Sequence, residues 1–266
     1  AFLTNREVIY KRLQRAKEKL REERIQIESP GPSAIDERMP SVLLTLYLVF
    51  NEGYYSASED VTLRKDLCLE AMRLTYLLKE HQQTDKPEVN ALLSLMCFHS
   101  SRFEARVGQH GETILYQDQD NDLWNQDLIT KGEYFLNLAS QGNKITKFHL
   151  EAAIAYWHTI KEDTEQKWEN ILQLYNQLLI IEYSPMAALN RTYALSKTNG
   201  KAHAIVEAEK INLTDNHLYH SLLGELYIGI DNVKALMHLE RALDLAKSAA
   251  DKNIISIKIS QLKNMV

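Results

Sequence analysis

The last third of the chain repeats itself with a period of 34 residues. The aligned pairs are Leu189 and Leu223, Asn190 and Gly224, Tyr193 and Tyr227, and Ala208 and Ala242. A unit of this length holds two helices that stack on the next unit, because one unit alone cannot bury its apolar face. Trp168, Leu172 and Tyr175, after a helix expected over 151–159, form a weaker upstream unit. The period therefore predicts three stacked helix pairs within residues 144–266.

The rest of the chain also has helical patterning, with one conspicuous break. The whole chain of 266 residues includes only nine glycines and five prolines, about half of average usage. Three of the prolines fall between Pro30 and Pro40, so we expect a linker over 25–40. Helices are expected over 41–50, where apolar residues on all sides predict full burial, and over 67–78, 87–107 and 128–139. The predicted fold is all-α: a helical bundle domain over 41–143, then a tetratricopeptide-like stack.

Cysteine usage and the length of the apolar runs indicate the cellular compartment of the protein. Cys68 and Cys97 are the only cysteines, too few for a disulfide scaffold, and this usage fits the reducing cytoplasm. The longest apolar run, over 42–50 with one threonine, is far shorter than the ~20 residues of a membrane helix. We therefore expect a cytoplasmic protein with no membrane partner.

Motifs for catalysis, metal binding and cofactors are missing from the sequence. The aspartates of 118–122 alternate like calcium ligands, but Leu123 and Ile129 stand where an EF-hand needs glycine and glutamate. His217 and His220 have no further ligand at a partnering distance. Neither a phosphate-binding glycine loop nor a nucleophile elbow occurs. We expect no catalytic residue, no metal site and no cofactor, and hence no enzyme.

Positive charge is concentrated at the amino-terminal end. Residues 1–24 carry a net charge of +4, and the other residues together carry −9. Thr4 and Glu7 predict a capping box, and Leu13 and Leu20 belong to an apolar stripe on the helix that follows. A cationic amphipathic helix on an acidic body indicates a polyanionic partner, whereas the alternative is a solvated surface helix. The chain begins at Ala1 without methionine, so we expect it to be a piece of a longer protein.

The sequence of this helix resembles a known DNA-binding element. RLQRAKEKLR at 12–21 is similar to the R-L-x-R-A-K-x-K-[IL]-R run that closes the helix-turn-helix of region four in extracytoplasmic-function sigma factors. The resemblance implies that 1–24 are the remnant of that helix-turn-helix, with 6–21 as its recognition helix. Such a helix reads base edges near its N-terminus and neutralises phosphates with flanking cations. The expected DNA contacts are Arg6, Tyr10, Lys11, Arg12 and Arg15, with Lys17 and Lys19 at most on the DNA backbone.

Further motifs resemble the subgroup of these sigma factors that has a long C-terminal extension. They are YLVFNEGY at 47–54, LCLEAMRL at 67–74, LYQDQD at 115–120 with Trp124, and SPMAALNR at 184–191. Asn121 departs from the arginine usual in that subgroup. The resemblance implies a bacterial transcription initiation factor whose partners are promoter DNA and the RNA polymerase core, with an extension that contacts the sigma regions. The alternative is a stand-alone helical-repeat scaffold for a protein or peptide.

The FNEGY segment at 50–54 admits two interpretations. In the structural one, Phe50 and Tyr54 are core residues, and Gly53 ends the helix in a left-handed turn. In the functional one, Asn51, Glu52 and Tyr54 form a partner-binding surface that docks on region four or on RNA polymerase.

Overall fold

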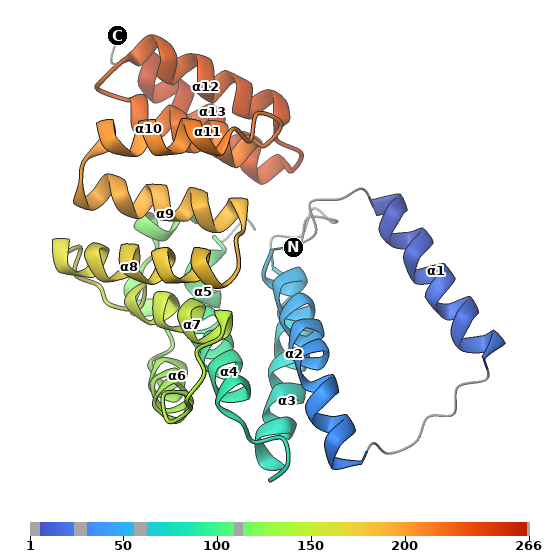
Figure 1. Ribbon diagram of the computed structural model, residues 1–266. Helices are drawn as coiled ribbons and strands as arrows, with labels where there is room; N and C mark the ends of the chain where they lie inside the picture. The colour runs from blue at the N-terminus through green and yellow to red at the C-terminus, as the bar shows by residue number, and fades with distance from the viewer. Residues whose placement is uncertain (1–5, 24–30, 56–62, 109–113, 265–266) are drawn as a thin grey trace.

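The fold is all-α, as the sequence predicts. The computed structural model describes residues 6–23, 31–55, 63–108 and 114–264, and every structural statement below refers to those residues (Figure 1). The helices are α1 (Arg6–Glu22), α2 (Pro32–Tyr54), α3 (Lys65–Glu80), α4 (Pro87–Ser100), α5 (Phe103–Arg106), α6 (Gln126–Ala139), α7 (Lys147–Trp157), α8 (Glu165–Ile181), α9 (Pro185–Thr198), α10 (Lys201–Ile211), α11 (His217–Tyr227), α12 (Asn232–Leu245) and α13 (Ala249–Lys263), with 3-10 turns η1 (Tyr116–Asp118) and η2 (Asn121–Leu123). No described helix has the length and apolar character needed to cross a bilayer.

Helix α4 forms the centre of the first half of the molecule. Nearly all of its residues are buried because α3, α6 and α7 pack around it. Its Ser94 hydroxyl donates to the carbonyl of Gly132 in α6 at 2.7 Å. A Cβ atom at Gly132 would come within 2.6 Å of the Phe98 ring, so this close approach requires glycine. The prediction that 41–50 is the fully buried helix is wrong, since Val42 and Leu44 of α2 are exposed.

Helix α2 is longer than the sequence predicts. Pro32 stands in its first turn, where the missing amide hydrogen is not needed. The helix then continues through Pro40, held by the buried Met39 side chain and by an ion pair between Asp36 and Lys86. The predicted linker over 25–40 is therefore wrong for residues 32–40, and 24–30 lie outside the described residues.

Gly53 lies inside α2 and not in a left-handed cap. Among the described glycines only Gly200 and Gly229 have a positive φ, so the predicted left-handed turn at Gly53 is wrong. A Cβ atom there would lie 2.8 Å from both the Arg64 carbonyl oxygen and the Cys68 Sγ. Glycine is needed at this position because the start of α3 packs directly against the α2 backbone.

Helices α7 to α13 form a stack in which each helix packs against the next (Figure 1). Helices α9 and α10 make one unit and α11 and α12 the following one, with α9 also contacting α11. The aligned residues Leu189 and Leu223 are both buried, and so are Ala208 and Ala242. This arrangement agrees with the predicted repeat period.

The core continues across the predicted domain boundary at residues 143–144. Helix α7 packs against α4 of the bundle as well as against α8 of the stack. Its residues Phe148, Ala152 and Ala155 belong to the same apolar cluster as Phe50 and Phe98. The bundle and the helical repeats therefore share α7 instead of meeting at a linker.

Candidate functional site

Helix α1 stands apart from the other helices and exposes every side chain that the structure describes in it (Figure 1). Its own contacts are local, such as Gln14 Nε2 to Glu18 Oε1 at 3.1 Å and Lys19 to Glu23 at 3.6 Å. The apolar stripe is also uncovered, with Leu20 54% exposed. The helix thus offers both a cationic and an apolar surface to a partner.

The predicted DNA contacts do not all lie on one face of α1. At about 100° per residue, Lys11 and Arg15 lie opposite the apolar stripe, and Tyr10 and Arg12 flank them on the two sides. All four side chains are exposed. Arg6 begins the helix, but the structure describes only its backbone and not its side chain. The predicted cap at Thr4 lies outside the described residues. A helix lying in a groove can use three such sides at once, since both walls of the groove approach it.

The predicted partner-binding surface at 51–54 is wrong for Tyr54. The Tyr54 side chain is only 4% exposed, its ring stacks on Phe50 at 6.0 Å, and the Arg106 guanidinium lies 4.2 Å from its centroid. Asn51 is half-buried and Glu52 is exposed. Tyr54 faces inward because it follows Phe50 by one helical turn. The structural interpretation therefore describes Phe50 and Tyr54, while Asn51 is partly exposed and Glu52 lies on the surface.

The acidic loop at 118–122 is tied into the fold. Asp120 caps η2 by accepting from the Asp122 amide at 2.9 Å, and Asp122 lies 3.6 Å from Lys161. His217 lies 3.5 Å from Asp251, whereas His220 meets His238 with 3.0 Å between their Nδ1 atoms. Within the described part of the chain, no three side chains of metal-binding type converge.

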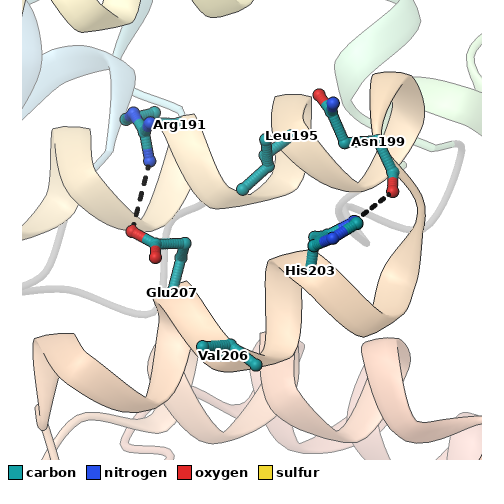
Figure 2. Close-up of a pocket in the computed structure, with 6 residues that line it drawn as sticks. All are labelled: Arg191, Leu195, Asn199, His203, Val206 and Glu207. Atoms are coloured by element: carbon teal, nitrogen blue, oxygen red, sulfur yellow. Dashed lines mark hydrogen bonds and ion pairs between the residues drawn. The ribbon is translucent and has the colours of Figure 1, made fainter.

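A shallow groove between α9 and α10 was not predicted from the sequence. Its volume is about 380 Å³, and its lining residues are Arg191, Leu195, Asn199, His203, Val206 and Glu207 (Figure 2). Arg191 donates to Asn176 Oδ1 at 2.6 Å and lies 3.8 Å from Glu207. Opposite charges thus meet on the rim, and Val206 and Leu195 provide apolar surface. No single residue here is distinctive, so only the pairing of the two helices reveals the groove.

The fold and these surfaces define an all-helical repeat protein with a separate cationic helix. Residues 38–140 match the model of a family described as a family of unknown function (DUF6596). The chain is 33% identical over 266 residues to an uncharacterized protein of Rhizobium meliloti (strain 1021). That match covers 98% of this chain and 63% of the relative, so the chain spans less than two thirds of the relative's length. No solved structure matches the chain.

The family match and the bundle coincide. Residues 38–140 run from within α2 to the end of α6 and include the motifs at 47–54, 67–74 and 115–120. Helices α7 to α13 and the cationic helix α1 lie outside the matched segment.

Proposed function

We propose that the chain is part of a sigma factor that directs RNA polymerase to specific promoters. In this proposal α1 is the recognition helix of region four, and α2 to α13 form a regulatory extension. The observation that carries the proposal is α1 itself, a cationic amphipathic helix with its charged and apolar sides both exposed. The motifs at 47–54, 67–74, 115–120 and 184–191, which follow in the order of the extended sigma factors, support it.

The dimensions of α1 fit this role. Its 17 residues extend over about 25 Å, and the DNA major groove is about 12 Å wide. With Lys11 and Arg15 directed into the groove, Arg12 approaches one phosphate backbone and Tyr10 the other. Leu13 and Leu20 then face away from the DNA, where the positioning helix of a helix-turn-helix would cover them.

Replacing Arg12 tests the proposal in the full-length protein. Arg12→Ala removes one exposed cation from α1, and we expect promoter-dependent transcription in vitro to fall about fivefold or more, because a lost DNA contact costs about 1–3 kcal/mol. Arg241→Ala is the matched control, since Arg241 is an exposed cation of α12 far along the chain from α1. Unchanged transcription by Arg12→Ala would contradict the assigned role.

The groove between α9 and α10 favours a second candidate, a helical-repeat scaffold that binds a protein or peptide and never meets DNA. Its charged rim of Arg191 and Glu207 beside apolar Leu195 suits an extended peptide. Purification of the full-length protein with and without residues 41–266 separates the two candidates. Recovery of the RNA polymerase core with the protein supports the sigma factor. Failure to recover it, together with the absence of a polymerase-binding segment upstream of Ala1, supports the scaffold.

A further inference from the structure

Tyr116, the first residue of η1, is the centre of a partly buried cluster of cations and aromatic rings. Its ring centroid lies 5.3 Å from the Arg102 guanidinium and 5.6 Å from the Lys167 ammonium group. The rings of Trp124 and His158 lie 6.1 Å and 5.2 Å from the same centroid. The cluster joins the end of α4, the loop that holds η1 and η2, the end of α7 and the start of α8.

Two positive charges are buried here with no carboxylate of the described residues at ion-pair distance. Arg102 is 8% exposed and Lys167 only 2%. Lys167 donates to the Ile160 carbonyl at 2.8 Å and to the Tyr116 hydroxyl at 3.2 Å, but neither cation forms an ion pair within the described residues. Asp163 and Glu162 are the acidic neighbours of Lys167, and Asp163 already accepts from the Trp168 indole and lies 3.5 Å from Lys197.

The charge of this cluster also affects the neighbouring histidine. Burial, with the cations of Arg102 and Lys167, lowers the pKa of His158 to about 3. His158 is therefore neutral at physiological pH, so the positive charge of the cluster comes from Arg102 and Lys167. Aromatic rings attract such cations, but buried charges are ordinarily paired as well.

Unused hydrogen-bond donors lie in the same place. The Arg102 Nε and the Trp124 Nε1 are both buried, and neither has an acceptor in the described part of the chain. The two groups are neighbours, since the Arg102 guanidinium lies 5.9 Å from the Trp124 ring. Buried N–H groups nearly always have a partner. Two unpaired donors beside two cations that lack an ion pair therefore call for one group that supplies both acceptor atoms and negative charge.

We propose that this cluster binds an oxyanion, the carboxylate or phosphate group of a small ligand, with Arg102 and Trp124 donating hydrogen bonds and Lys167 adding charge. Ionised oxygens accept the strongest hydrogen bonds and pair with guanidinium groups in a planar geometry. Because the cluster connects α4 with α8, the bound oxyanion links the bundle to the helical repeats. The site is independent of α1 and does not require the sigma-factor assignment.

Titration of the full chain with inorganic phosphate or with acetate, each against sodium chloride of equal ionic strength, tests the proposal. We expect the melting temperature to rise with one or both oxyanions and to follow a saturable binding curve, since a ligand of the folded state alone stabilises it. A response to phosphate alone assigns a phosphate group, and a response to acetate alone assigns a carboxylate. The absence of any rise beyond the chloride reference would overturn the proposal.

Two variants localise the site. Trp124→Phe keeps an aromatic ring but deletes the unpaired donor together with part of the indole ring system, so we expect oxyanion affinity to fall at least tenfold while the chain stays folded. Arg102→Gln should abolish the response, and Arg241→Gln, the same change of charge at an exposed position, should leave it unchanged. If Arg102→Gln fails to fold, Trp124→Phe decides. Wild-type oxyanion affinity in Trp124→Phe would mean that the Trp124 donor takes no part in binding, and would overturn the proposal.

Discussion

Gly53→Ala tests whether the contact between α2 and α3 is as close as the structure has it. Arg64 N donates to the Gly53 carbonyl at 2.8 Å, and an added Cβ would lie 2.8 Å from the Arg64 carbonyl oxygen. The same Cβ would lie 2.8 Å from Cys68 Sγ and 3.0 Å from Cys68 N. Two of the three atoms that the Cβ would meet belong to the backbone, so they cannot rotate away as a flexible side chain would.

Two opposing effects determine the size of the change. Forcing an extra methyl group into a packed site costs about 1–3 kcal/mol, and the backbone obstacles place Gly53 in the upper part of that range. Alanine favours a helix over glycine by about 1 kcal/mol, which offsets part of the cost. The expected net loss in the free energy of unfolding is therefore about 1–2 kcal/mol, and the melting temperature should fall by about 2–8 °C.

Urea unfolding followed by circular dichroism measures this difference. Gly31→Ala is the matched control, because nothing lies within 4 Å of a Cβ there and its φ of −68° suits alanine. We expect the control to stay within about 0.5 kcal/mol of the wild type. If Gly53→Ala is as stable as the wild type or more stable, the close approach of α3 to α2 is refuted.

Two further predictions concern carboxylates. Burial raises the pKa of Glu151, whose Oε1 accepts from Tyr47 at 3.2 Å, from 4.5 to about 7. The protonated form is thus favoured in the folded state, and the stability that it contributes, about 3 kcal/mol, is present below pH 4.5 and lost as the pH rises through 7. Glu151→Gln should match the wild type in urea unfolding at pH 4.5 and exceed it at pH 8; equal stability at pH 8 would contradict the shift. Glu52→Lys, at an exposed position, should leave the melting temperature within a few degrees of the wild type, and lost promoter activity in that folded variant would assign Glu52 to docking, whereas full activity would exclude it.

The motifs of the bundle show how much of the structure a sequence pattern can predict. The FNEGY segment indicates a helix end and a special glycine, and Gly53 is indeed restricted. The reason for the restriction is a contact with Arg64 and Cys68, which no local pattern contains. Pro40 shows the opposite case, because a residue that ordinarily interrupts a helix is accommodated where Met39 and the Asp36–Lys86 ion pair fix the turn that precedes it.

Of the two candidate sites, one could be predicted from the sequence and the other could not. The cations of α1 could be assigned to one helix from the sequence, because residues three and four apart always share a face. The cluster around Tyr116 could not, since Arg102, Trp124 and Lys167 come from separate segments that only the fold brings together.

The order of residues along the chain was sufficient to predict the all-helical class, most of the helices, the 34-residue repeat and the cationic amphipathic end, because helical periodicity depends on hydrogen bonds four residues apart. Tertiary structure decided that α4 and not the 41–50 segment is central, that Tyr54 points inward, and that two buried cations share one cluster. These outcomes depend on packing between segments far apart in the chain. Whether a residue is buried there depends on the segment that packs against it as much as on the residue itself.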